Sequence, residues 1–520
     1  MPTILLLGLT CFLLVAPLLF PLVELARQPA GFRALLETPR IASLIRNTLG
    51  LAVGATTLAV PVGIAVGALV ERGRVRYRMA LRGLVLLGVV LPLPVYAAAW
   101  QAVFGLTVVP DAGGWRPWVL GLLPAIWVHA VAGLPWVAVF VMLALRSADP
   151  QLEDDAQLAG GRRAVWRGVL WPRVRLAAFA GACWVVIQAF TEATVTDLFM
   201  VRTFAEEVYF QLVGNPAGVA AAVAVTLPVW FLAALIAVAV LKCVAATDTV
   251  IPVRARAPTP LAGTRAQTAL VWFTVCVLVG VPFLGLTARI GELGLLAQVA
   301  RAHGSILVVS IFWSGLAGLS AATLALGVCW RARDSWRCSA LLVVLTAVAW
   351  VTPAPLVGFG LKSLIGAFVS LEDAILGSDA AFAPLRSLLY DQPSPVPGIW
   401  AAIVRFFPFA VAVLWPAVRA IPQELIDAAI LDGGRPAVLR SAVWPGVRGA
   451  FALAVVAVGL LSLGEVVATK LVQPPGRRSF AADLFDAMHY GADATVAGMC
   501  MLQIAVTGVI VACLIRRLRD

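Results

Sequence analysis

The stretch "LEDDAQLAGGRRAVWRGVLWP" (152–172) interrupts a strongly apolar chain with charged residues and a Gly-Gly pair. A second stretch, "LIDAAILDGGRPAVLRSAVWP" (425–445), repeats it at a constant offset of 273 positions. Nearly half of the aligned positions between 146–172 and 419–445 are identical. The two copies predict a chain built from two repeated halves, each of which carries one such loop.

The composition surrounding these loops is that of a membrane protein. The chain has 520 residues, of which 61% are hydrophobic and 13% are charged, and its mean hydropathy is +0.96. Soluble domains are about half apolar and about a quarter charged. Apolar runs of about twenty residues recur along the chain, and each is long enough to cross a bilayer as a helix.

No strand-like alternation of apolar and polar residues competes with these runs, so we expect an all-α polytopic fold rather than a barrel. The first run is interpreted as a retained helix, because no basic residue precedes Arg27 and the run exceeds a normal signal core. The sequence predicts about twelve transmembrane helices, at 3–24, 46–70, 82–104, 119–145, 174–200, 219–241, 269–287, 306–330, 339–361, 398–418, 447–470 and 495–515.

Weaker repeats extend the match beyond the loops. The Pro-x-Pro of "LPLPVYAAAW" (91–100) recurs in "TPAPLVGFGL" (352–361), and "TFAEEVY" (203–209) recurs as "SFAADLF" (479–485). The offset changes from 261 to 276 along the chain, which predicts a longer outside loop near 362–397 in the second half.

Six spans in each half restore the starting side of the membrane, so the repeats are expected to be parallel. The predicted organisation is a first transmembrane half at 1–247, a Pro- and Arg-containing cytoplasmic linker at 248–268, and a second transmembrane half at 269–520.

The basic residues predict the orientation of the chain. Most of the 39 lysines and arginines fall in alternate loops, and cytoplasmic loops collect Lys and Arg. Both termini are therefore expected on the cytoplasmic side of an inner membrane. This topology accounts for the net charge of +12 without a nucleic-acid partner; membrane lipid is the expected surrounding.

Metal and nucleotide chemistry find little support in the sequence. The eight cysteines lie in or beside apolar runs without a Cys-x-x-Cys pair, and the three histidines are scattered, so no metal site or catalytic cluster is predicted. A P-loop requires Gly-Lys followed by Ser or Thr. The three lysines, Lys242, Lys362 and Lys470, follow Leu241, Leu361 and Thr469, so no ATP site of that kind is expected.

The repeated loops read physically as short helices outside the membrane. Asp149 can cap a helix that Pro150 opens, and glycine pairs commonly end helices. Small and apolar residues such as Leu152, Ala156, Leu425 and Ala429 are flanked by carboxylates, among them Glu153 in the first copy, which suits docking into a partner's groove. The alternative is that each loop covers the inner ends of its own helices. Two nearly identical loops in two halves favour a two-fold partner.

These loops resemble the signature of ATP-binding-cassette importer permeases, in which Glu-Ala-Ala, three residues and Gly precede a Leu-Pro. Both copies here have Asp in place of the leading Glu, and the spacer is one residue shorter than in the family. In the first copy, Asp155 also stands in place of an Ala of the motif. The residues at the positions of the signature are Asp154, Asp155, Ala156, Gly160, Gly161 and Pro172 in the first copy and Asp427, Ala428, Ala429, Gly433, Gly434 and Pro445 in the second.

The resemblance implies that each loop is a coupling helix seated in an ATPase subunit. Two copies of that subunit would bind ATP-Mg, and this chain would hold no cofactor and would not be an enzyme. A periplasmic or extracellular solute-binding protein would deliver the solute. Two fused halves, with "VRTFAEEVY" and "PPGRRSFAADLFDAMHYGADATVA", are most similar to permeases for ferric iron, with those for thiamine next.

Two carboxylates within predicted spans are candidates for the transport pathway. Glu192 and Glu465 coincide at the offset of 273, and ionisable residues inside a membrane are costly. They are expected either to line the pathway or to form a hydrogen bond or ion pair between helices. A secondary, ion-coupled transporter would also have twelve helices and would use such carboxylates, and a membrane enzyme acting on lipid-linked substrates is a further alternative.

Overall fold

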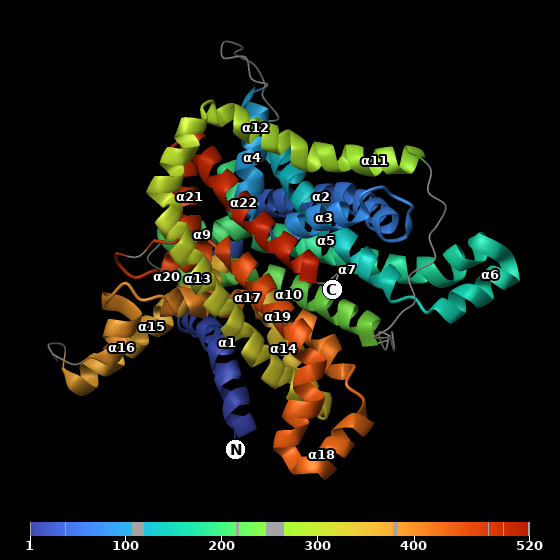
Figure 1. Cartoon of the computed structure of the whole chain (residues 1–520). Coiled ribbons are helices and arrows are strands. Elements are labelled where there is room, and N and C mark those ends of the chain that lie inside the picture. The colour runs from blue at the N-terminus through green and yellow to red at the C-terminus, as the bar shows by residue number, and fades with distance from the viewer. Residues whose placement is uncertain are drawn as a thin grey trace. The chain divides into compact units, whose positions relative to one another are not determined.

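We describe the fold from a computed structural model, which describes residues 2–36, 38–106, 119–214, 218–245, 265–377, 383–476, 478–491 and 493–517. Every regular element in these ranges is a helix (Figure 1). The prediction of an all-α protein is therefore confirmed for this part of the chain. The predicted linker at 248–268 lies mostly outside the described residues, which resume at Arg265.

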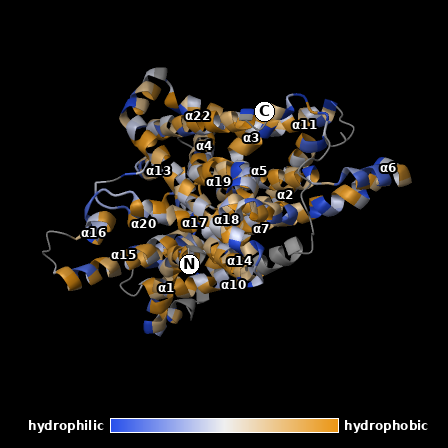
Figure 2. Ribbon diagram, turned by 60° about the horizontal axis from the view of Figure 1, so that its bottom comes forward, coloured by the Kyte–Doolittle hydropathy of each residue, from blue (hydrophilic) through white to orange (hydrophobic). Residues whose placement is uncertain are grey.

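Ten described helical segments are long and apolar enough to cross a membrane, and a bent pair of helices would make an eleventh. Figure 2 shows how hydrophobic residues dominate these helices. The chain is thus a multi-pass membrane protein. The ten segments are Leu5–Arg27, Arg40–Arg72, Leu122–Arg146, Pro150–Thr191, Arg265–Ile290, Gly294–Arg333, Ala354–Leu376, Val396–Arg419, Val438–Leu463 and Asp493–Arg516.

The predicted span at 82–104 is broken in the middle. Helix α3 (Arg78–Val90) and helix α4 (Leu93–Leu106) meet at an angle of 104°. The break falls at Leu91 and Pro92, where Leu91 has an extended backbone. Proline lacks an N–H and disfavours a helical conformation in the preceding residue, so the Pro-x-Pro sequence ends one helix and starts the next.

The predicted span at 339–361 is wrong for the same reason. Helix α14 (Trp336–Val351) ends at Thr352, and helix α15 begins at Ala354 directly after Pro353. Helix α15 then continues to Leu376, through residues that the sequence placed in an outside loop near 362–397. The short helices α16 (Pro384–Arg386) and η4 (Ser387–Asp391) follow it, so that part of the predicted loop is also helical.

The described chain packs as two compact units, each assembled from three separate segments. One unit, called unit 1, contains 1–42, 204–235 and 305–483, and the other, unit 2, contains 43–203, 236–304 and 484–520. Each unit therefore combines the centre of one predicted half with the end segments of the other. The halves at 1–247 and 269–520 remain a prediction from sequence repetition, since packing follows a different division of the chain.

Unit 2 is organised around helices α5 and α7, which pack along each other. Their buried residues include Val137, Val141 and Val174. Helix α3 packs on α5, and α22 packs on α3, α4 and α12. The elements are most of α2 (Thr38–Arg72), α3, α4, α5 (Leu122–Arg146), α6 (Pro150–Ala164), the π-helix η2 (Val165–Leu170), α7 (Trp171–Thr191), α8 (Thr194–Leu198), α11 (Arg265–Val275), the π-helix η3 (Cys276–Gly280), α12 (Val281–Ile290) and α22 (Asp493–Arg517).

Unit 1 has the same arrangement around helices α17 and α19. Phe407, Leu414 and Val447 are completely buried there. The elements are α1 (Pro2–Arg27), η1 (Pro29–Leu36), α9 (Phe204–Gly214), the first part of α10 (Gly218–Ala245), most of α13 (Leu293–Arg333), α14, α15, α16, η4, α17 (Val396–Arg419), α18 (Gln423–Ala437), the π-helix η5 (Val438–Val443), α19 (Trp444–Leu463), α20 (Val467–Val472) and the start of α21 (Phe480–His489).

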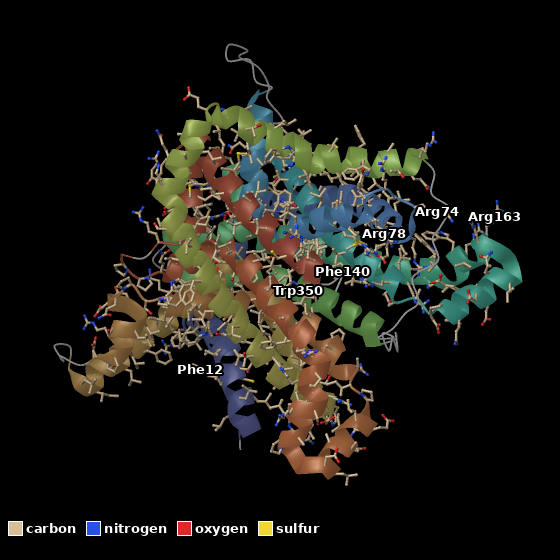
Figure 3. All side chains as sticks on the ribbon, viewed as in Figure 1. Phe12, Arg74, Arg78, Phe140, Arg163 and Trp350 are labelled. Atoms are coloured by element: carbon tan, nitrogen blue, oxygen red, sulfur yellow. The ribbon has the colours of Figure 1, made fainter. Side chains whose placement is uncertain are left out.

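Helix α1 is an integral part of unit 1. It packs on α15 and α17, and the indole nitrogen of Trp400 donates a hydrogen bond to the carbonyl oxygen of Leu13 (2.8 Å). Phe12, labelled in Figure 3, contacts the rings of Phe368 and Trp400. A side chain at Gly360 would overlap the carbonyl of Pro17, so glycine permits the close approach of α1 and α15.

Candidate functional site

The repeated loops form two helical hairpins with the same backbone. In the first, α6 runs to a glycine pair and the chain turns back into η2; in the second, α18 and η5 do the same (Figure 1). Gly160 and Gly433 have extended φ angles of −164° and −174°, while Gly161 and Gly434 have φ and ψ of 66° and −159° and of 69° and −158°. Only glycine adopts the latter conformation readily.

The start of the first hairpin follows the predicted capping chemistry. The Asp149 side chain accepts a hydrogen bond from the backbone N–H of Gln151 (2.9 Å), and Pro150 occupies the first helical turn. An N-terminal cap and a glycine-specific turn together define the length of α6. Figure 3 labels Arg163, an exposed cation just after the glycine pair.

Most of the candidate docking residues are accessible. The structure leaves Ala429 buried, so this residue packs within its own unit. The exposed residues are Asp154, Asp155, Gly160, Asp427, Ala428, Gly433 and Pro445, and the half-buried ones are Ala156, Gly161, Pro172 and Gly434.

Each hairpin also exposes a leucine that the sequence analysis did not single out. Leu158 and Leu431, which correspond at the offset of 273, are both 87% exposed. Leu152 and Leu425 are 48% and 46% exposed. The identity of Leu158 with Leu431 in the two copies was the available signal. The two hairpins thus expose a leucine at the same position of the repeat.

A buried ion pair anchors the first hairpin to helix α2. The Arg72 guanidinium donates two hydrogen bonds to the carboxylate of Glu153, at 2.7 and 2.9 Å, and a further one to the carbonyl of Leu145. The Arg72 and Glu153 side chains are only 1% and 7% exposed. Glu153 therefore faces inward, although the sequence suggested that it flanks the exposed surface. The paired geometry fixes α6 relative to the ends of α2 and α5.

The second hairpin is held by a corresponding arginine, whose two acceptors are neutral groups. Arg333 follows Arg72 at the offset of 261 and donates to the carbonyl of Ile421 (2.8 Å) and to the side-chain oxygen of Gln423 (3.3 Å). The position of Glu153 is taken by Ile426, which is buried. Both hairpins thus contact an arginine at the end of a long helix, α2 for the first and α13 for the second. Only the first uses a buried carboxylate.

Glu192 and Glu465 lie where two helices break. Predicted spans at 174–200 and 447–470 instead end at Thr191 and Leu463, and short helices α8 and α20 follow. The Glu192 carboxylate accepts hydrogen bonds from the N–H groups of Thr194 (2.7 Å) and Val195 (3.0 Å).

Glu465 plays the same part in unit 1. Its two carboxylate oxygens accept hydrogen bonds from the N–H groups of Ala468 (2.9 Å) and Thr469 (2.8 Å). Each glutamate therefore caps the short helix that follows it, because its carboxylate accepts from N–H groups of the first turn that have no partner within the helix. This capping role differs from both roles expected from the sequence, which were lining of the pathway and a hydrogen bond or ion pair between helices. The two glutamates lie in different units, and each is described separately.

The surroundings of the two glutamates differ. Glu192 has the buried side chain of His129 beside it, with 3.9 Å between Nε2 of His129 and a carboxylate oxygen. Glu465 lines a cavity of about 80 Å³ in unit 1. Within the described ranges, no group of three or more His, Cys, Asp or Glu residues is placed to hold a metal ion.

No protein-family model, curated protein or solved structure gives a significant match to this chain. The class that the fold defines is an all-α multi-pass membrane protein with two matched hairpins.

Proposed function

We propose that this chain is the transmembrane permease subunit of an ATP-binding-cassette importer. It would consist of two parallel six-helix halves, with twelve crossings of the inner membrane and both termini in the cytoplasm. Two copies of a separate ATPase subunit would dock on the hairpins at 150–170 and 423–443. A solute-binding protein outside the cytoplasm would deliver the solute, for which ferric iron is the first candidate and thiamine the second.

The observation that carries this proposal is the pair of hairpins. They share turn angles that agree within about 10°, and each presents a leucine that is 87% exposed. Contact with a partner would withdraw this apolar surface from water, which favours binding. Two equal apolar projections suit a partner that binds twice in the same way.

The anchoring arginines suggest how force would pass between partner and membrane. Arg72 joins the first hairpin to the end of α2 and, through the Leu145 carbonyl, to the end of α5. Arg333 joins the second hairpin to the end of α13. A movement of either hairpin, driven by ATP-dependent closure of the partner, would therefore be carried into long apolar helices of its unit. Differential binding of nucleotide to two states would bias alternating access.

The experiment that tests this function is uptake into proteoliposomes that contain the chain and its co-purified ATPase. Solute is supplied as iron-loaded or thiamine-loaded binding protein, with ATP inside or outside the vesicles. Uptake that requires ATP on the hairpin side and survives dissipation of ion gradients supports the importer. Uptake that needs an ion gradient and ignores ATP would instead identify the alternative, a secondary transporter.

A further inference from the structure

The cavity in unit 1 is the strongest unassigned feature of the described chain. It lies beside the break between α19 and α20, and α13 and α17 supply its other walls. Its volume of about 80 Å³ is several times the roughly 10–15 Å³ that one water requires on this measure. Its lining is mostly apolar but includes residues with polar side chains, among them Glu465, Ser314, Ser462 and Thr469.

The chain carries its own comparison for this cavity. At the offset of 273, Glu465 corresponds to Glu192, Gly398 to Ala125 and Ala402 to His129. In unit 2, the imidazole of His129 is completely buried beside the capping carboxylate. Its Nδ1 lies 2.9 Å from the carbonyl oxygen of Ala125, and its Nε2 lies 3.9 Å from Glu192 without a hydrogen-bond partner.

At the two matching positions of unit 1, both among the described residues, no side chain is large enough to take the place of that imidazole. Ala402 and Gly398 both line the cavity, and they have one side-chain carbon and none. The cavity therefore occurs where two small residues replace His129 and Ala125, beside a glutamate held in the same capping role. The space next to Glu465 can therefore hold a group from outside the chain, whereas in unit 2 the His129 imidazole occupies the matching place.

The chemistry of the lining selects the charge of a ligand. The Glu465 side chain uses two acceptor sites for backbone N–H groups, and a carboxylate offers about four. The indole of Trp313 also lines the cavity, and aromatic faces attract cations. The lining cation, Arg478, is 77% exposed at the rim and lies 3.9 Å from the carboxylate of Asp483. A buried carboxylate with hydroxyl groups and an aromatic ring favours a cation with N–H donors.

We infer that this cavity binds a small organic cation, whose N–H group meets Glu465 in the place that the His129 imidazole occupies beside Glu192. As a site on the transport pathway, this assignment rests on the proposed function, and it favours organic cations over ferric iron as the solute class. The site is asymmetric, because one unit fills the position with its own side chain.

Isothermal titration of the purified full-length chain in detergent tests this inference directly. The probes are histamine and thiamine as organic cations, and ferric citrate as the metal control. The decisive variant is Ala402→His, which introduces the residue that unit 2 already has at the matching position. Ala412→His, at an exposed position on the same helix α17, controls for adding a histidine. Glu465→Gln removes the charge.

We expect at least one organic cation to bind the wild type and the Ala412→His variant. Affinity should fall about tenfold or more in Ala402→His and in Glu465→Gln, as lost charged hydrogen bonds predict. Unchanged thermal unfolding of Ala402→His, together with retained ATPase co-purification, would show that this variant folds. If Ala402→His does not fold, Ala402→Leu, which fills the same space with apolar atoms, is measured instead.

Three results would overturn the inference: no binding of either cation by the wild type, equal binding by the cavity-filling variant, or tighter binding of ferric citrate than of both cations. The titration uses the chain without its ATPase. Failure of cation binding with intact ATPase co-purification would therefore reject the cavity alone, and the reverse result would reject the proposed function alone.

Discussion

Arg72 and Glu153 form a two-point ion pair, at 2.7 and 2.9 Å, in which both side chains are almost completely withdrawn from solvent. Eighty-one positions separate the two residues. Breaking a buried pair by removing one partner costs about 3–5 kcal/mol, since the other charge remains buried. This contact makes the first hairpin a fixed extension of α2.

We predict that Arg72→Ala lowers the thermal unfolding temperature of the purified chain much more than Arg333→Ala. Loss of the Arg72 side chain leaves the buried carboxylate of Glu153 without its partner. Loss of the Arg333 side chain affects only the carbonyl of Ile421 and the exposed side-chain amide of Gln423. Unfolding is followed by tryptophan fluorescence in detergent. Asp155→Asn, a change at an exposed carboxylate, should have little effect. Equal losses for the two arginine variants would contradict the proposed difference between the hairpins.

The glycine turns predict a local rather than a global effect. Gly161→Ala and Gly434→Ala place a side chain at φ angles of 66° and 69° with ψ near −159°, a strain of about 1–3 kcal/mol. Hydrogen exchange should become faster in 150–170 and 423–443 while the unfolding temperature changes little. Gly168→Ala in η2 and Gly449→Ala in α19 are the controls, because a side chain at either position also meets nothing within 4 Å and neither glycine has a positive φ. Unchanged exchange in the hairpins would show that the turns tolerate alanine.

The exposed leucines predict the number of bound ATPase subunits. Leu158→Ser and Leu431→Ser each remove one of two equivalent apolar projections, so each single variant should retain one ATPase copy where the wild type has two. Native mass spectrometry of the detergent complex counts the copies. Tyr490→Ser changes a residue of similar exposure (86%) outside the hairpins and should retain both. If a single leucine variant keeps two ATPase copies, the substituted leucine is not required for the contact with the ATPase.

The capping role of Glu192 predicts which substitution is damaging. Glu192→Ala removes both acceptors for Thr194 and Val195 and should cost about 0.5–2 kcal/mol. Glu192→Gln keeps one carbonyl oxygen as an acceptor and should cost less. Thermal unfolding of the two variants distinguishes them. Equal destabilisation would mean that the charge of Glu192, rather than its acceptor geometry, holds this region, as an ion pair would require.

Several of these features could be predicted from the sequence because they are local or repeated. The Gly-Gly turns, the Asp149 cap and the boundaries of the hairpins follow from short-range backbone chemistry. The repeated Pro-x-Pro also contained the breaks at Leu91 and Thr352. Hydropathy concealed these breaks, because residues on both sides of each are equally apolar.

Contacts between distant segments could not be predicted in the same way. Glu153 reads as a surface carboxylate until Arg72 is placed beside it, and nothing in the intervening residues signals that contact. Glu192 and Glu465 looked like midplane charges because a helix break within an apolar run leaves no change in composition. The cavity could not be predicted from the sequence alone. Its recognition required both the offset that aligns Ala402 with His129 and the packing that brings each of these positions next to a glutamate.

The central claim is that α6 and α18 dock a separate ATPase. The most direct measurement is affinity purification of the tagged chain in mild detergent, with Mg-ATP hydrolysis assayed in the eluate and the co-purifying subunit checked for a P-loop. We predict activity with the wild type and with Gly168→Ala/Gly449→Ala, and strongly reduced activity with Gly161→Ala/Gly434→Ala. An eluate with neither ATPase activity nor a P-loop subunit in any form, or undiminished activity in the turn variant, would contradict it.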